Sequence, residues 1–276
     1  MRVHEGEPVR TKVAAIQMVS GADVPGNLAA AGRLVAAAAA QGARLVALPE
    51  NFYLIGRHES DKVKAREREG GGPIQDFLAD AARRNRVWLL GGTAPIEAED
   101  EGRILSASLL YDDTGRRVAR YDKMHLFRFD GGAGEHYDEA RTLEPGARVV
   151  AVASPFGRLA LSICYDVRFP ELYRSLGEFD LMFVPSAFTV PTGQAHWELL
   201  LRARAVENQA YVIAPAQGGL HESGRRTYGH TMIVDPWGEV LALRPEGEGV
   251  VAAEVDSDKI REVRAALPAL LNRRLA

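Results

Sequence analysis

The chain has 276 residues, of which 46% are hydrophobic and 26% are charged, so it can bury a sizeable core and lacks the composition of a disordered protein. Its formal net charge of −3 gives no basic footprint for nucleic-acid binding. No apolar run reaches the roughly 20 residues of a membrane-spanning helix, and the first ten residues lack the apolar core of a signal peptide. One cysteine cannot form an intramolecular disulfide. We therefore expect a cytoplasmic protein with no membrane or nucleic-acid partner.

The first half of the chain alternates between strands and helices. Asn27 is a candidate N-cap for a helix that runs to about Gln41, and Pro73 suits the first turn of a second helix. Between these two helices, the polar segment 58–72 is expected to form a short surface helix and a loop. Segments with the character of buried strands lie at 12–19, 44–50, 87–93 and 104–122, the last being two strands joined at 112–115.

The second half of the chain repeats this plan. Residues 158–166 take the place of the first strand, and a last helix is expected at 257–266 after Asp256. Because the similar segments occur in the same order, we predict two similar halves related by an internal pseudo-two-fold axis. The pairs are 44–52 with 180–188, 77–90 with 200–213, and 111–117 with 234–240.

Alternating strands and helices predict an α/β fold, and the hairpins predict mixed sheets. Ligands of such folds bind beyond the carboxyl ends of the strands. Glu50 ends one predicted strand and Cys164 ends another. We therefore expect these two side chains to face the same crevice.

Cys164 is the only cysteine, and a lone strand cysteine is most often a small buried hydrophobe. Its place at a strand end, just before a charged turn, weakens that structural interpretation and leaves a nucleophilic role open. A nucleophilic thiol needs a partner that takes its proton. The chain has seven histidines, but none stands in a recognisable cysteine–histidine signature, so such a pair stays open without local support.

Glu50 is the alternative base. Proton transfer from a thiol near pKa 8.5 to a carboxylate near 4.3 is uphill by about four units, or roughly 6 kcal/mol. Burial of the carboxylate raises its pKa, and a nearby cation lowers that of the thiol. Lys123 is a candidate cation. Most lysines are solvated surface charges, but this one lies between a strand and an apolar segment.

Three motifs resemble the nitrilase superfamily, the carbon–nitrogen hydrolases: LPEN with Glu50, YDKMHLF with Lys123 and SICYDVRFPEL with Cys164. The resemblance covers about residues 11–265, and the segment DEARTLEPG resembles the one that carries a second glutamate, Glu139. It implies a four-layer α-β-β-α sandwich with two mixed sheets. It also implies one domain over 11–262, between an N-terminal tail at 1–10 and a C-terminal tail at 263–276.

The resemblance implies a mechanism as well. Glu50 takes the proton of Cys164, the thiolate attacks an amide carbonyl, and Lys123 stabilises the oxyanion together with the backbone N–H that follows Cys164. Water then hydrolyses the thioester. Glu139 would hold Lys123 and help to position substrate or water. The mechanism needs no metal and no organic cofactor.

Two segments, GQAHWELLLRARA at 193–205 and YGHTMIVDPWG at 228–238, resemble the deaminated glutathione amidase branch more than the omega-amidases. The alternatives are an omega-amidase acting on 2-oxoglutaramate or 2-oxosuccinamate, another small-amide or carbamoyl hydrolase, and a catalytically silent scaffold. Intact catalytic positions argue against the scaffold. Candidate substrate contacts are Tyr165, Arg128, Arg168 and His196.

Two of these candidate contacts, His196 and Arg168, also have a structural interpretation. His196, with Trp197, fits a helix start over the core, and Arg168 fits an ion pair with Asp166 or Glu171. Arg128 is preferred over Arg168 because it lies in the loop 127–139, which is expected to rim the pocket.

The helix expected at 169–177 predicts how copies of the chain assemble. Superfamily members commonly dimerise near the helix that follows the cysteine motif, so we expect at least a homodimer. The apolar residues at helical spacing could serve both the core and the interface; they are Phe169, Leu172, Tyr173 and Leu176.

Overall fold

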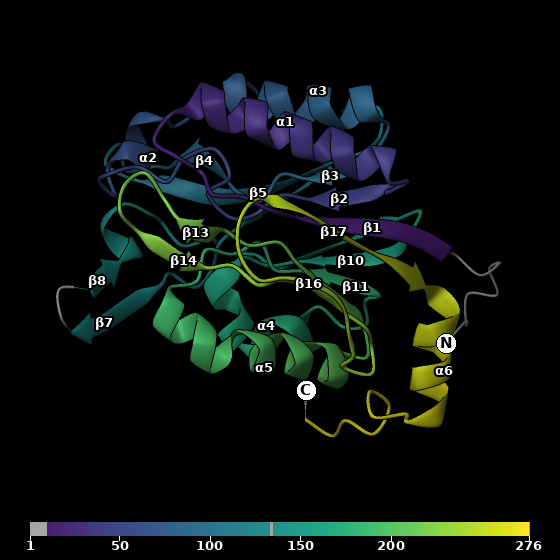
Figure 1. The fold of residues 1–276 in the computed structure, drawn as a ribbon. Helices are drawn as coiled ribbons and strands as arrows, with labels where there is room; N and C mark the ends of the chain where they lie inside the picture. Colours follow the sequence, from purple (N-terminus) through teal and green to yellow (C-terminus); the bar gives the residue numbers. More distant parts are fainter. Residues whose placement is uncertain (1–9, 133–134, 276) are drawn as a thin grey trace.

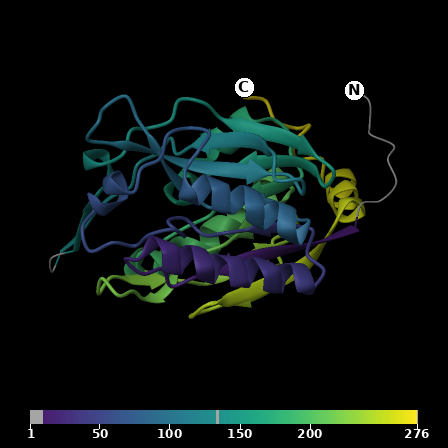
Figure 2. The same ribbon diagram turned by 90° about the horizontal axis from the view of Figure 1, so that it is seen from above.

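The structure, a computed structural model, describes residues 10–132 and 135–275, so the predicted N-terminal tail lies outside it apart from Arg10. Two β-sheets stack face to face, with α1 and α3 on one outer face and α4 and α5 on the other (Figure 1). Figure 2 shows α1 and α3 side by side across the first sheet. The predicted α-β-β-α sandwich is confirmed.

The first sheet has the order β17-β1-β2-β3-β5-β4, with β6 paired to β5. Its central strands β1, β2 and β3 are parallel, while β5 and β17 run antiparallel to their neighbours. The strands are β1 Arg10–Gln17, β2 Leu45–Ala47, β3 Trp88–Leu90, β4 Ala94–Glu97, β5 Ile104–Tyr111, β6 Arg117–Asp122 and β17 Gly249–Asp256.

The second sheet has the order β16-β15-β12-β11-β10-β9. Its central strands β10, β11 and β12 are again parallel, flanked by antiparallel β9 and β15. The same succession in both sheets confirms the predicted internal pseudo-two-fold. The strands are β9 Val150–Ser154, β10 Gly157–Leu161, β11 Leu181–Phe183, β12 Tyr211–Ala214, β15 Thr231–Val234 and β16 Val240–Arg244.

The helices and two additional hairpins complete the fold. The hairpins β7–β8 and β13–β14 form small sheets of their own, which the sequence did not predict, and they lie at the same end of the molecule as α2 (Figure 1). The hairpin strands are β7 Arg128–Gly132, β8 Glu135–Asp138, β13 Gly218–Leu220 and β14 Arg226–Tyr228. The helices are α1 Val24–Ala40, α2 Asp61–Lys64, α3 Pro73–Asn85, α4 Pro170–Ser175, α5 Val190–Asn208 and α6 Ser257–Ala266, with 3₁₀ segments η1 Glu139–Arg141 and η2 Cys164–Arg168.

Helix α1 begins earlier than its predicted cap. The side chain of Asp23 is the N-cap and accepts a hydrogen bond from the Gly26 N–H at 2.9 Å. The prediction that Asn27 caps this helix is wrong, because Asn27 lies inside it and is buried. Its amide donates instead to the carbonyls of Gly21 and Tyr53, at 2.9 and 2.8 Å, and so ties the helix to the loops at the sheet edge.

Apolar side chains form two core clusters. One fills the space between the two sheets and continues under α5, and the other lies between the first sheet and helices α1 and α3. Within the described ranges, no helix is long and apolar enough to cross a membrane.

Gly92 follows β3 and brings two strand ends into contact. Its φ is 49°, and a Cβ on it would lie 2.0 Å from the carbonyl oxygen of Pro49. Pro49 directly precedes Glu50, so only glycine lets the chain after β3 pack against the chain after β2.

We expect Gly92→Ala to lower the free energy of unfolding by about 3 kcal/mol, because overpacking adds to the positive φ. Gly42→Ala is the matched control: its φ is also positive, 87°, but a Cβ there has no atom within 4 Å, so we expect a cost of about 1 kcal/mol. Urea denaturation measures both. Equal losses would show that the contact with Pro49 does not matter.

Candidate active site

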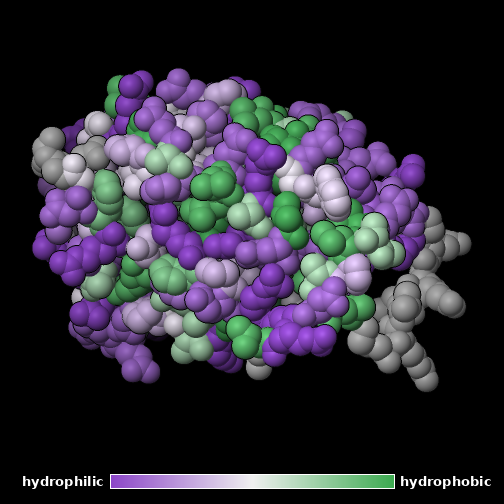
Figure 3. Space-filling view, turned by 90° about the horizontal axis from the view of Figure 1, so that it is seen from below, coloured by the Kyte–Doolittle hydropathy of each residue, from purple (hydrophilic) through white to green (hydrophobic). Residues whose placement is uncertain are grey.

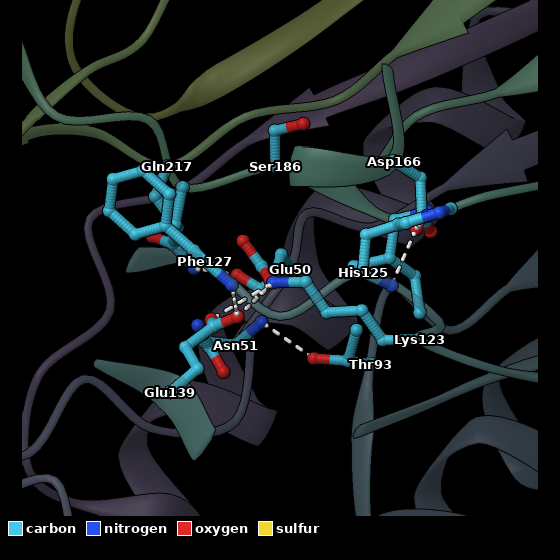
Figure 4. A network of polar contacts seen from close by, with 12 residues as sticks. Glu50, Asn51, Thr93, Lys123, His125, Phe127, Glu139, Asp166, Ser186 and Gln217 are labelled. Atoms are coloured by element: carbon cyan, nitrogen blue, oxygen red, sulfur yellow. Dashed lines mark hydrogen bonds and ion pairs between the residues drawn. The ribbon is translucent and has the colours of Figure 1, made fainter. Parts of the chain in front are cut away.

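Lys123 lies at the centre of the site, between two carboxylates (Figure 4). Its Nζ is 2.8 Å from Oε1 of Glu50 and 2.9 Å from Oε1 of Glu139, and its side chain has no exposed surface. The second oxygen of Glu139 accepts the Phe127 N–H at 2.7 Å. Such charge-assisted bonds are strong, and they fix all three charged groups relative to one another.

Loops from both sheets hold Glu50 in place. Glu50 follows β2 and is 3% exposed, and the side chain of Gln217, after β12, donates to its carbonyl at 3.1 Å. The next residue, Asn51, has a φ of 56°, and its N–H donates to Thr93 Oγ1 at 2.9 Å. The base candidate therefore sits at the junction of three strand ends.

Cys164 turns away from the second sheet at the end of β10. It begins η2 with a φ of 47°, a conformation that costs a non-glycine residue about 1–2 kcal/mol. Its N–H donates to the carbonyl of Pro185 at 2.9 Å, which fixes the turn against the chain after β11. Its side chain lines the same pocket as Glu50 and Glu139, as the strand-end argument predicts for Glu50 and Cys164.

Asp166 connects the turn after β10 to the chain that follows β6. Its fully buried carboxylate accepts the Ile163 N–H at 2.8 Å, the Tyr121 hydroxyl at 2.7 Å and the His125 N–H at 3.1 Å, and His125 Nδ1 lies 2.7 Å away. The nucleophile candidate and the lysine thus belong to segments that share one buried anchor.

The electrostatics of the pocket keep the thiol neutral. Burial raises the pKa of Cys164, and the carboxylate of Glu50 raises it further, whereas Lys123 and the backbone N–H of Ala187 lower it; the net pKa is well above the ordinary value. Burial disfavours the charge on Lys123, but Glu139 and Glu50 outweigh it and raise the lysine pKa well above its usual range. Lys123 lowers the thiol pKa, as expected, but burial and the charge of Glu50 raise it by more.

Two of the four predicted substrate contacts, Tyr165 and Arg168, line the pocket. The guanidinium of Arg168 lies 5.6 Å from the ring centre of Tyr165 and 5.4 Å from that of Phe188. Among the side chains that the structure describes, Arg168 has no carboxylate within ion-pairing distance. The competing interpretation, an ion pair with Asp166 or Glu171, is therefore wrong.

The other two lie apart from the pocket lining. Arg128 is exposed on β7 and is not among the pocket-lining residues, so the geometry does not support its rank above Arg168. His196 is exposed in the second turn of α5, and its Nδ1 is 3.3 Å from Arg168 Nη1. Because α5 begins at Val190 with Thr189 as its cap, the predicted helix start at His196 is also wrong. Trp197 does pack over the core, with 1% exposure.

Several residues of the pocket were not predicted. Most adjoin a predicted motif in the chain, but Arg225 comes from the loop of the β13–β14 hairpin, and its only signal is its nearness to the YGH segment. The additional lining residues are Asn51, Phe127, Ala187, Phe188, Thr189, Thr192 and Arg225.

We expect Glu50→Gln to shift the titration of Cys164 to lower pH. The substitution removes a negative charge that raises the thiol pKa and leaves Lys123 to favour the thiolate. Thiolate absorbance in the ultraviolet against pH measures this directly, because the chain has one cysteine. Cys164→Ala supplies the baseline, and an unchanged midpoint in Glu50→Gln would contradict the electrostatic account.

Comparisons with known proteins agree with this geometry. The family model for carbon-nitrogen hydrolase matches residues 12–265. The deaminated glutathione amidase of Synechocystis sp. is 43% identical over 94% of this chain and 97% of its own length. The crystal structure of the C. elegans NitFhit protein superimposes with a TM-score of 0.87 at 37% identity, over 96% of this chain and 65% of that one. Saccharomyces cerevisiae Nit3, of the nitrilase superfamily, gives a TM-score of 0.85 at 32% identity, over 96% of this chain and 97% of its own. The chain belongs to the carbon–nitrogen hydrolase family.

Proposed function

We propose that this protein is a cysteine-dependent amidase that hydrolyses a non-peptide amide bond through a thioester, with deaminated glutathione as its substrate. The observation that carries the proposal is the buried Lys123 between Glu50 and Glu139, two carboxylates that line one pocket with Cys164. Several relatives named deaminated glutathione amidase, from bacteria to human, support the substrate.

The first step forms the tetrahedral intermediate that precedes the thioester. Glu50 takes the Sγ proton as Sγ attacks the amide carbonyl carbon, and the carbonyl electron pair moves to oxygen. The ammonium of Lys123 and the backbone N–H of Tyr165 stabilise this oxyanion. Because the thiol pKa is raised, proton transfer accompanies attack rather than preceding it.

The second step releases the amine. The oxyanion collapses, the C–N bond breaks, and the protonated Glu50 gives its proton to the leaving nitrogen. Glu50, again ionised, then takes a proton from water, which attacks the thioester and frees the acid and the Cys164 thiol. Glu139 keeps Lys123 oriented throughout, through the 2.9 Å contact.

The acyl half of the substrate accounts for one wall of the pocket. A 2-oxoglutaryl group ends in a carboxylate, and Arg168 offers a guanidinium with no described carboxylate partner. The rings of Tyr165 and Phe188 border the same space and suit the two methylenes. We assign no contact with the acyl group to Arg128 or His196.

Activity on two amides tests the proposal. We expect a higher kcat/KM for deaminated glutathione than for 2-oxoglutaramate, and Cys164→Ala should lower kcat by at least about 10⁴-fold while circular dichroism stays unchanged. Glu50→Gln should lower kcat by at least about 10²-fold. A preference for 2-oxoglutaramate would assign an omega-amidase instead, and full activity in Cys164→Ala would refute the nucleophile.

We propose further that the protein is cytoplasmic and forms a homodimer. A nucleophilic thiol must stay reduced, which the cytoplasm ensures. For the dimer, three residues of the expected interface, Leu172, Tyr173 and Leu176, are buried in their own core and are not available. Figure 3 shows the molecule from the side of α4 and α5, where hydrophobic residues are exposed among hydrophilic ones. On α5, the apolar side chains of Leu199 and Val206 are 68% and 47% exposed.

We expect light scattering to give at least twice the chain mass at micromolar concentration. Leu199→Asp combined with Val206→Asp should shift this mass toward that of one chain, because charge at a buried interface is costly. Leu241→Asp, on the exposed surface of β16, is the control and should leave the mass unchanged. A single-chain mass for the unmodified protein would overturn the dimer.

A further inference from the structure

Arg225 is a pocket residue with an unused donor. Its Nη2 donates to the carbonyl of Ala187 at 3.2 Å, and its guanidinium lies 5.1 Å from the ring centre of Tyr137 on β8. Its Nε is buried and has no hydrogen-bond partner. Among the described side chains, no carboxylate lies within ion-pairing distance of the guanidinium, although its charge lowers the pKa of Glu59 from farther away. A guanidinium that lines a pocket without such a carboxylate partner is able to bind an anionic group of a ligand.

Hydrogen bonds fix the position of the β13–β14 hairpin, which carries Arg225. The Tyr228 N–H donates to the carbonyl of Phe188 at 2.9 Å, which joins β14 to the pocket wall. His221 lies 2.9 Å from the carbonyl of Ser20 and 2.7 Å from Thr227 Oγ1, and burial lowers its pKa to about 4, so it stays neutral near pH 7. The position of the guanidinium is therefore set by the fold.

Two arginines line the pocket, Arg168 and Arg225, and neither has a carboxylate within ion-pairing distance among the described side chains. Glu50 and Glu139 bond to Lys123 instead, and the three groups together carry a net charge of −1. Two guanidinium groups suit a substrate with two carboxylates. Deaminated glutathione has two, one on the acyl group and one on the terminal glycine, whereas 2-oxoglutaramate has one.

The two arginines come from different elements of the chain. Arg168 belongs to the 3₁₀ segment of the nucleophile itself, close to the acyl group. Arg225 belongs to a hairpin whose neighbouring residues Glu222 and Arg226 are exposed, at the end of the molecule where β7, β8 and α2 also lie (Figure 1). We infer that a dipeptide attached to the scissile nitrogen extends from Cys164 toward this hairpin, because Arg225 lines the pocket and its neighbours in the hairpin reach the surface.

We propose that Arg225 binds the terminal carboxylate of the leaving dipeptide and so determines the preference for a peptide amide over a simple amide. The inference rests on the proposed function, whose substrate has such a carboxylate. Arg225 is a binding residue for the part of the substrate that departs, and Arg168 serves the part that stays on Cys164.

Three substrates separate this role from any other. They are deaminated glutathione, its analogue with a carboxamide in place of the terminal carboxylate, and 2-oxoglutaramate. We expect Arg225→Gln to lower kcat/KM for deaminated glutathione by about 10- to 150-fold, the value of a charged hydrogen bond. The loss on the other two substrates should be at least about tenfold smaller. Unmodified protein should show a comparable loss when the carboxylate becomes a carboxamide.

Two further variants serve as controls. Arg225→Lys keeps the charge without the planar fork and should recover part of the loss. Arg226→Gln changes the adjacent arginine, which is exposed and ion-paired with Glu246, and should behave as the unmodified protein. Activity on the carboxamide analogue also shows that each variant is folded.

The possible contrary results are distinct. An equal loss on all three substrates would place Arg225 with the acyl group or the fold and overturn the proposal, as would no loss on deaminated glutathione. If the unmodified protein hydrolyses neither deaminated glutathione nor its carboxamide analogue, the proposed function is refuted before any variant is made. This inference, which rests on that function, is then refuted as well.

Discussion

The placement of one buried ammonium between two carboxylates constrains the whole site. Lys123 is fully buried, so without Glu50 and Glu139 its charge would cost several kcal/mol. The two partners come from separate parts of the chain, one at the end of β2 and one in η1. The first sheet and the segment that follows β8 must therefore be assembled before this charge is stable, which couples the site to the fold.

In the proposed mechanism, the same three groups explain how a neutral thiol can act as a nucleophile. In the resting site they carry a net charge of −1, which opposes a second negative charge on Cys164. When Glu50 takes the thiol proton and the substrate oxygen becomes an oxyanion, the negative charge moves from one partner of Lys123 to another. The total charge beside the ammonium is unchanged, so little reorganisation is needed.

The sequence was enough to locate the candidate residues at strand ends. It was not enough for residues whose position depends on tertiary contacts. Glu50 and Cys164 follow from the rule that ligands bind beyond strand ends, because each ends an apolar run. Glu139 needed the family resemblance, since it meets Lys123 only through a hairpin that no periodicity indicates. Sequence alone did not show that Arg128 lies outside the pocket lining, because exposure within a polar loop depends on how the loop folds back.

The residues proposed for the reaction and the residue proposed for substrate choice belong to different structural elements. Glu50 and Cys164 stand at the ends of sheet strands, and Lys123 directly follows β6, so their spacing is fixed by sheet register and by glycine contacts such as that of Gly92 with Pro49. Arg225 stands instead in a hairpin outside both sheets. Such a loop can change its residues or length without moving a sheet strand, and hence without disturbing the ammonium and its two carboxylates. The specificity of this scaffold for the departing amine can therefore vary while the acyl-transfer chemistry stays constant.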